Sequence, residues 1–294
     1  MKQKPQPYDH PTIAAVGLGC ARIGSIRGLG PKEAQALIDL AYERGVRLFD
    51  TANSYGQGDS EKIVGISLAG RQDVVIVTKL GKQVPRKARI LKPVKTIMRG
   101  LVKLSSQTDR AVRKARGGVF PVCFDEPLLQ HQLDQSRRRL RRDCLPVVML
   151  HSATEQVLKA GNAIGFLEKA REAGALEQIG VSVDGLAAAE ACLADSRIQM
   201  IQAPIAYGDE AMQNWSARAA ASGRHVVARE VFRYADGSSP ARTQNVIARL
   251  LQQAIGTPGV STCLVGTINS IHLDQLLNVA DACADASSRR NYEQ

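Results

Sequence analysis

Eight short apolar stretches, rich in β-branched residues, recur along the chain. They are TIAAVGLG (12–19), VRLFD (46–50), DVVIVTKL (73–80), LPVVMLH (145–151), QIGVSV (178–183), MIQAPI (200–205), HVVARE (225–230) and VSTCLVG (260–266). Between them lie stretches rich in Ala, Leu, Glu and Arg, with apolar residues at helical spacing. Strands that are apolar on both faces are typical of a buried parallel sheet. The pattern therefore predicts eight strand-helix units.

Eight such units in 294 residues favour a (β/α)8 barrel, the TIM-barrel fold. We expect a single barrel domain over residues 1–294. The alternative is a doubly wound open sheet with a small second domain, because strands and helices alternate there as well.

One connection is longer than the others. More than 40 residues separate the third predicted strand from a helix expected to begin near Glu126, whereas such loops usually have about 2 to 6. We treat residues 81–121 as an insertion. Within it, KPVKTIMRGLVKL places apolar residues on one face and basic residues on the other, which predicts a short amphipathic helix beginning near Pro93. Such a helix could cover a substrate site, lie on an anionic membrane or be solvated charge without a role.

Positive charge is concentrated in the same region. Residues 79–142 contain 18 Lys and Arg against 4 Asp and Glu, while the net charge of the whole chain is +11. The remainder is slightly acidic, which indicates a basic segment on an ordinary domain. We therefore expect no nucleic-acid partner.

The cysteines and the N-terminal stretch indicate the cellular compartment that we expect for the protein. The six cysteines form no CxxC pair, and MKQKPQPYDHPTIAAV lacks the apolar segment of a signal peptide. We expect reduced thiols, a cytoplasmic protein and no metal site. No uncharged apolar run approaches the roughly 20 residues of a membrane helix, so membrane association is not expected.

Four titratable residues follow consecutive predicted strands. Asp50 ends the second strand, Lys79 lies at the end of the third, His151 ends the fourth, and Tyr55 lies in the loop after the second. The C-terminal ends of barrel strands meet at one mouth. Each residue alone has an ordinary explanation, such as a turn cap or a satisfied buried histidine. Their combination in this order favours an active site.

The chemistry of this group follows from the phenol. A tyrosine has a pKa of about 10, too high for ready proton exchange at neutral pH. A nearby ammonium stabilises the phenolate and a carboxylate fixes that ammonium, so Lys79 and Asp50 would make Tyr55 a general acid. A neutral His151 could donate to a carbonyl oxygen and orient it. None of the four supplies a hydride, which must come from a bound cofactor.

Three segments of the sequence resemble the aldo-keto reductases. FDTANSYGQGDSE is similar to the family's strand-two signature, VTKL to its lysine strand, and LRRDCLPVVMLH to the segment that carries its histidine. The resemblance extends over nearly the whole chain. It implies a (β/α)8 barrel that reduces a small-molecule aldehyde or ketone with NAD(P)H, and it implies that the four residues above are catalytic.

The resemblance also implies a dinucleotide site built from the later strands. Ser182 and Gln202 match positions that hold the nicotinamide carboxamide, but Val183 stands where an asparagine is expected. The other implied positions are Glu230, Val231 or Phe232 for the wall beside the nicotinamide, Gly266, Thr267 and Asn269 for the phosphate-binding turn, His272 for a 2′-phosphate and Gln275 for the adenine. Leu276 replaces a second amide. NADPH is the expected cofactor, with NADH as the alternative.

Three functions remain open at this point. The first is NADPH-dependent carbonyl reduction. The second is a nicotinamide-nucleotide-binding regulatory or interaction subunit with little turnover, which the changes at Val183 and Leu276 and the basic insertion favour. The third is a lyase that forms a Schiff base through Lys79, which would leave Tyr55 without a role. The pattern selects no particular carbonyl compound and no oligomeric state.

Overall fold

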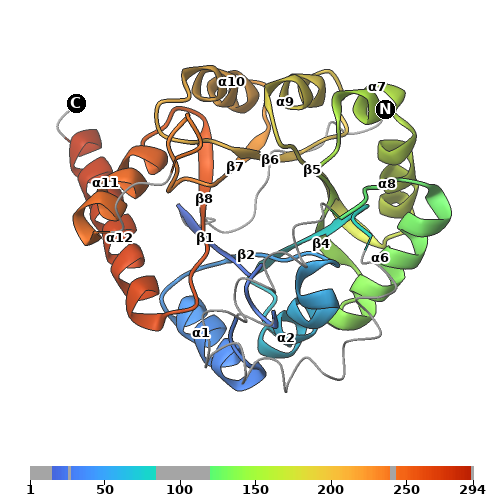
Figure 1. The fold of residues 1–294 in the computed structure, drawn as a ribbon, viewed down its shortest axis with the longest axis horizontal. Helices are drawn as coiled ribbons and strands as arrows, with labels where there is room; N and C mark the ends of the chain where they lie inside the picture. The colour runs from blue at the N-terminus through green and yellow to red at the C-terminus, as the bar shows by residue number, and fades with distance from the viewer. Residues whose placement is uncertain (1–14, 26–27, 84–119, 239–242, 293–294) are drawn as a thin grey trace.

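The computed structural model describes residues 15–25, 28–83, 120–238 and 243–292. Eight parallel strands form a closed barrel in the order β1 to β8, and β8 pairs with β1. Helices surround the barrel (Figure 1). The predicted (β/α)8 fold is confirmed, and the open-sheet alternative is wrong because the first and last strands are hydrogen bonded. The amphipathic helix predicted near Pro93 lies outside the described residues.

The strands are β1 (Val16–Gly19), β2 (Leu48–Asp50), β3 (Val75–Leu80), β4 (Leu145–His151), β5 (Leu176–Ser182), β6 (Met200–Pro204), β7 (His225–Arg229) and β8 (Val260–Val265). The helices are α1 (Pro31–Glu43), the 3-10 turn η1 (Tyr55–Gly58), α2 (Asp59–Ser67), α6 (Glu126–Leu140), α7 (Glu155–Ala160), α8 (Asn162–Glu172), α9 (Leu186–Leu193), α10 (Glu210–Ala221), α11 (Gln244–Ile255) and α12 (Ser270–Tyr292). Each predicted apolar stretch coincides with one strand, and β5 begins two residues before its stretch. Among the described residues, no helix is long and apolar enough to cross a membrane.

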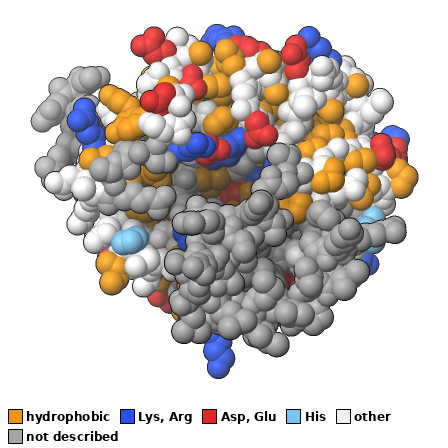
Figure 2. Space-filling view, viewed as in Figure 1, with side chains coloured by type: hydrophobic (Ala, Val, Ile, Leu, Met, Phe, Trp, Pro, Cys, Tyr) orange, Lys and Arg blue, Asp and Glu red, His pale blue; other side chains and the backbone are white. Residues whose placement is uncertain are grey.

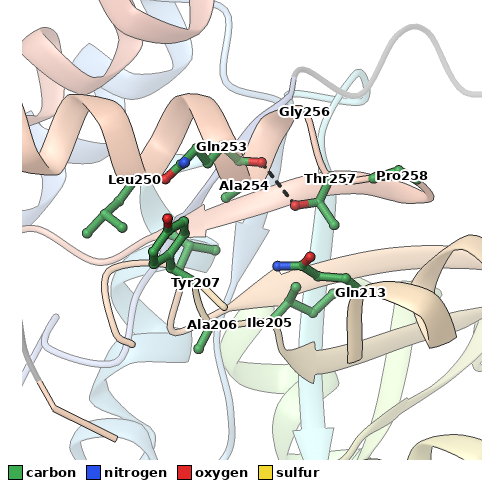
Figure 3. A pocket seen from close by; sticks show the side chains of 11 residues that line it. Ile205, Ala206, Tyr207, Gln213, Leu250, Gln253, Ala254, Gly256, Thr257 and Pro258 are labelled. Carbon is green, nitrogen blue, oxygen red and sulfur yellow. Dashed lines mark hydrogen bonds between the residues drawn. The ribbon is translucent and has the colours of Figure 1, made fainter. Parts of the chain in front are cut away.

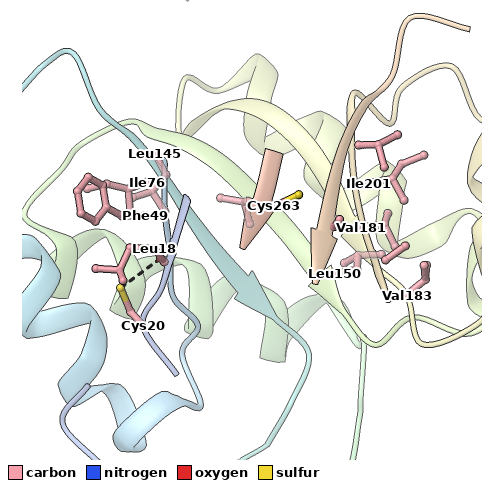
Figure 4. Close-up of a cluster of buried hydrophobic side chains, with 14 of the residues drawn as sticks. Leu18, Cys20, Phe49, Ile76, Leu145, Leu150, Val181, Val183, Ile201 and Cys263 are labelled. Atoms are coloured by element: carbon pink, nitrogen blue, oxygen red, sulfur yellow. Dashed lines mark hydrogen bonds between the residues drawn. The ribbon is translucent and has the colours of Figure 1, made fainter. Parts of the chain in front are cut away.

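Alternation along the strands creates two apolar clusters. The inner cluster fills the barrel and consists of Leu48, Val75, Val77, Val147, Met149, Met200, Val227 and Leu264. The outer cluster packs the strands against the helices, and Figure 4 shows part of it, including Phe49, Val181 and Val183. In β5, Val181 and Val183 therefore face the helices, and alternation turns Ser182 toward the barrel interior.

Helices α2 and α6 approach each other closely at Gly65. A Cβ there would lie 2.4 Å from the carbonyl oxygen of Arg139 and 2.6 Å from the Cα of Leu140. Because both are backbone atoms, Gly65→Ala must push the helices apart, and we expect the free energy of unfolding to fall by about 1–3 kcal/mol. Urea denaturation measures this change.

The matched control is Gly165→Ala in α8, where a Cβ would meet nothing within 4 Å. Alanine has the higher helix propensity, so we expect this substitution to raise the free energy of unfolding by about 0.5–1 kcal/mol. Equal effects of the two substitutions would contradict the close α2–α6 contact.

Candidate active site

Three neighbouring strands bring the predicted catalytic residues to one end of the barrel. Asp50 is the last residue of β2, Lys79 lies one residue before the end of β3, and His151 is the last residue of β4. These strands are parallel and pair in sequence. Tyr55 begins η1, in the loop that follows β2. The structure thus places the four residues together.

Lys79 lies at the centre of this group. Its Nζ donates to Asp50 Oδ1 at 2.5 Å, to the carbonyl oxygen of Thr51 at 3.0 Å and to Tyr55 Oη at 3.4 Å. Lys79 is 0% exposed and Asp50 is 4% exposed. Burial lowers the pKa of Lys79, but the carboxylate of Asp50 and the phenol outweigh it, so the net pKa is raised. Lys79 is therefore protonated and positively charged at neutral pH.

The pKa of Tyr55 is set by burial as well as by the neighbouring charge of Lys79. Burial raises the pKa of Tyr55 by more than the charge of Lys79 lowers it, so the net pKa is above its usual value. Lys79 does favour the phenolate, as expected, but burial and the carboxylate of Asp50 act in the opposite direction. Tyr55 consequently stays protonated at neutral pH, which is the form that a proton donor requires.

His151 faces the ring of Tyr55. The two ring centroids are 5.9 Å apart with an interplanar angle of 88°. Burial, followed by the positive charges of Lys79, Lys82 and Arg229, holds the pKa of His151 well below its usual value. Within the described structure its Nδ1 is buried and has no hydrogen-bond partner. The imidazole is therefore neutral at pH 7, as a hydrogen-bond donor to a carbonyl oxygen should be.

Two predicted cofactor residues are connected to this group by hydrogen bonds. Ser182 Oγ donates to Gln202 Oε1 at 3.0 Å, and Gln202 Nε2 donates to Asp50 Oδ1 at 2.8 Å. Both residues are buried. A continuous polar path thus runs from β5 through β6 and Asp50 to Lys79.

Val183, which stands where the family resemblance implies an asparagine, does not face the barrel mouth. Val183 is 0% exposed and belongs to the outer apolar cluster. Its carbonyl oxygen accepts a hydrogen bond from Arg229 Nη2 at 2.7 Å. Arg229 also forms ion pairs with Asp184 and Glu230, and it links the end of β7 to the segment after β5. Figure 2 shows basic and acidic side chains side by side at the rim of a central hollow.

Sequence reasoning missed Arg229 and Lys82, whose charges both act on His151. Their positions in the sequence could have identified them, because both lie at C-terminal strand ends. Arg229 is the last residue of β7, and Lys82 lies three residues after Lys79, just past β3.

A cavity of about 640 Å³ lies beside the C-terminal end of β8. Six predicted cofactor residues line it: Phe232, Gly266, Thr267, Asn269, His272 and Gln275. Leu276 lines it too, together with Arg22 and Gln244, which the sequence analysis did not select. The structure thus gathers residues from the loops after β1, β7 and β8 and from α11 and α12 around one space.

Asn269 caps the helix at the edge of this cavity. Its Oδ1 accepts from the backbone N–H of Ile271 at 2.9 Å and of His272 at 3.2 Å. These are two of the N–H groups that a phosphate could use at the start of α12. Asn269 is consequently a helix cap in this structure.

The three candidates for the nicotinamide wall point in different directions. Phe232 lines the 640 Å³ cavity, whereas Glu230 pairs with Arg229 and Arg233. Val231 is 2% exposed and lines a separate cavity of about 360 Å³ outside the barrel, between α10 and α11 (Figure 3). Phe232 is therefore the one of the three that lies at the larger cavity.

Comparison with solved structures shows the same fold. A putative aldo-keto reductase from Pseudomonas aeruginosa is 20% identical, with a TM-score of 0.72 over 95% of this chain and 97% of that chain. An aldo-keto reductase from Klebsiella pneumoniae in complex with NADPH is 19% identical, with a TM-score of 0.62 over 91% of this chain and 85% of that chain.

Sequence comparison identifies the family. The chain is 32% identical over 174 residues to a D-threo-aldose 1-dehydrogenase from a Pseudomonas species, which covers 58% of this chain and 50% of that protein. An aldo-keto reductase from Alternaria alternata is 32% identical over 159 residues, which covers 50% of this chain and 40% of that protein. The chain thus spans half or less of the length of these curated relatives. Residues 15–236 match the sequence profile of the Aldo/keto reductase family, and the chain therefore belongs to that family.

Proposed function

We propose that this protein reduces an aldehyde or ketone to an alcohol with a reduced nicotinamide dinucleotide. The observation that carries the proposal is the buried hydrogen-bonded path that ends at Lys79 Nζ and Tyr55 Oη, 3.4 Å apart, beside the neutral imidazole of His151. A protonated phenol and a neutral imidazole at one barrel mouth suit the oxygen of a carbonyl group.

Each of the four residues has a distinct role in this proposal. Tyr55 donates its proton to the carbonyl oxygen as negative charge develops there. Lys79 stabilises the phenolate that remains, and Asp50 holds the ammonium in place. His151 donates to the same oxygen and orients it. A dinucleotide held by the residues of the cavity would supply the hydride for the carbonyl carbon.

The described residues fit such a dinucleotide. The 640 Å³ cavity has a size typical of cofactor sites. At Gly266 a Cβ would meet nothing within 4 Å, so the backbone turn after β8 is open to a ligand. Ser182 and Gln202 would meet the nicotinamide end, and Arg22, Thr267 and the residues of α12 would hold the remainder.

We expect tighter binding of NADPH than of NADH. Among its described lining residues, the cavity has Arg22 and His272 and no carboxylate, whereas sites that prefer NADH commonly place an acidic residue on the ribose 2′-hydroxyl. Arg22→Gln should weaken NADPH binding by about tenfold, because one charge-assisted hydrogen bond is lost. Fluorescence titration with each dinucleotide measures both dissociation constants.

Lys62→Gln is the control for this prediction. Lys62 lies on α2, outside the barrel, and its replacement removes the same charge. An equal loss in Arg22→Gln and Lys62→Gln would show a general electrostatic effect, and an unchanged NADPH constant in Arg22→Gln would remove Arg22 from the site.

A panel of aldehydes and ketones, followed by NADPH oxidation, tests the proposed function directly. The reverse reaction belongs in the same experiment, because the Pseudomonas relative is named a dehydrogenase. Tight NADPH binding without turnover in either direction would instead support the nucleotide-binding regulatory subunit.

A further inference from the structure

Lys82 is held firmly at the end of β3. Its carbonyl oxygen accepts from Gln132 Nε2 at 3.2 Å and from Asn53 Nδ2 at 3.4 Å. The preceding Gly81 N–H donates to Gln132 Oε1 at 2.7 Å. Three hydrogen bonds from two elements thus fix the backbone from which the Lys82 side chain extends.

Lys82 is half-buried, and its ammonium is not paired with any described carboxylate. Within the described structure it forms no ion pair and no side-chain hydrogen bond, and burial lowers its pKa. Asp184 is the described carboxylate whose charge favours the ammonium, but Asp184 is paired with Arg229. A partly desolvated cation without a partner is costly, and such groups are enriched at ligand sites.

Lys82 lies at the same end of β3 as the proposed catalytic residue Lys79. Its charge acts on His151 together with the charges of Lys79 and Arg229. Lys82 follows β3, whereas the 640 Å³ cavity lies at β8 and β1, so two strand pairings separate β3 from β1 along the barrel. Its charge therefore acts on the catalytic end of β4 and lies on a different side of the barrel from the residues expected to hold the dinucleotide phosphates.

The other described cations whose charges act on His151 have acidic partners. Lys79 pairs with Asp50, and Arg229 pairs with Asp184 and Glu230. Of these three cations, Lys82 is accordingly the one that forms no ion pair with a described residue.

We propose that Lys82 binds an anionic group of the substrate, so that the preferred substrate is an aldehyde or ketone that also carries a carboxylate or a phosphate. This inference rests on the proposed reductase function and specifies its substrate class. An anion at Lys82 would gain a charge-assisted hydrogen bond, and the carbonyl group of the same molecule would reach Tyr55 and His151.

Paired substrates test the proposal. We expect the wild-type protein to have a higher kcat/KM for succinic semialdehyde than for butanal, or for glyceraldehyde phosphate than for glyceraldehyde. The two pairs distinguish a carboxylate from a phosphate. Lys82→Gln should lower the anionic-to-neutral ratio by about tenfold or more, and Lys82→Arg should restore most of it.

Lys62→Gln is again the matched control, because it removes one positive charge from the outer surface. Its anionic-to-neutral ratio should equal that of the wild type. A wild-type protein that does not favour either anionic substrate, or a Lys82→Gln variant that keeps the wild-type ratio, would overturn the proposal. A fall of both rates in proportion would show a structural role and would overturn it as well.

Saturation-transfer NMR of the protein with NADPH, butanoate and butanamide provides a test that needs no turnover. The wild-type protein should bind butanoate in preference to butanamide, and Lys82→Gln should lose that preference. If this result holds while no aldehyde is reduced, the anion site stands and the proposed reductase function fails. If neither compound binds preferentially, the anion site fails whatever the turnover.

Discussion

Tyr55→Phe is expected to lower turnover by about 10² to 10⁴ on every aldehyde that the wild-type protein reduces. The substitution removes the hydroxyl that lies 3.4 Å from Lys79 Nζ and keeps the aromatic ring against His151. Since Tyr55 is not among the residues that line the 640 Å³ cavity, the dissociation constant of NADPH should stay near the wild-type value. Steady-state kinetics and a fluorescence titration measure the two quantities.

Tyr42→Phe is the matched control, because it removes a phenol that hydrogen bonds to Asp73 on the periphery. Its turnover should equal that of the wild type. The raised pKa of Tyr55 also gives an expectation for pH: its proton should remain available through neutral pH and be lost only above the ordinary phenol value of about 10. Wild-type turnover in Tyr55→Phe would exclude Tyr55 as the acid.

Lys79→Met is expected to lower the free energy of unfolding by about 3–5 kcal/mol, because it leaves the carboxylate of Asp50 buried without a counter-charge. Methionine retains much of the volume of the lysine stem, so the loss reports mainly the charge. Urea denaturation of the protein without dinucleotide measures it, and turnover should fall in parallel.

The double variant Asp50→Asn with Lys79→Met separates charge from packing. It removes both charges, so we expect it to recover most of the lost stability. Lys159→Met serves as the control, because Lys159 pairs with Glu155 on an exposed helix surface. This substitution should lower the free energy of unfolding by about 0.5 kcal/mol or less. If Lys79→Met costs no more than Lys159→Met, the buried pair is not a major source of stability.

The fold was predictable because its strands are apolar on both faces. DVVIVTKL and LPVVMLH have no alternating polar side, which distinguishes barrel strands from those of a half-exposed sheet. The predicted stretches are longer than some of the strands: 46–50, for instance, begins two residues before the first paired residue of Leu48–Asp50. Closure of the barrel depends on pairing between the chain's first and last strands, which no local pattern contains.

The site was predictable where it follows from strand ends alone. Asp50, Lys79 and His151 needed only the rule that parallel strands present their C-terminal ends together. The net pKa of Tyr55 was not predictable, because it depends on how completely the folded protein excludes water from the phenol. Arg229 reaches the carbonyl oxygen of Val183, 46 residues earlier in the chain, and a contact of that kind appears only after folding.

The roles of the polar side chains around the 640 Å³ cavity were also not predictable. Asn269 fits a phosphate-binding turn by type and position, yet its Oδ1 accepts from two backbone N–H groups of α12. A side chain that can serve either a ligand or a helix end cannot be assigned from sequence alone.

The two ends of the insertion after β3 lie side by side. Gln83 N–H donates to the Pro121 carbonyl at 2.9 Å, Cys123 N–H donates to the Gly81 carbonyl at 2.9 Å, and Lys82 faces Val122 across an antiparallel bridge. Because the barrel already holds these ends together, a change in the length of the intervening chain alters mainly the entropy of closing a loop, about 0.6 kcal/mol per doubling. This point of the barrel can therefore gain or lose whole segments during evolution at little thermodynamic cost, and it is a natural place to insert a reporter domain next to the proposed active site.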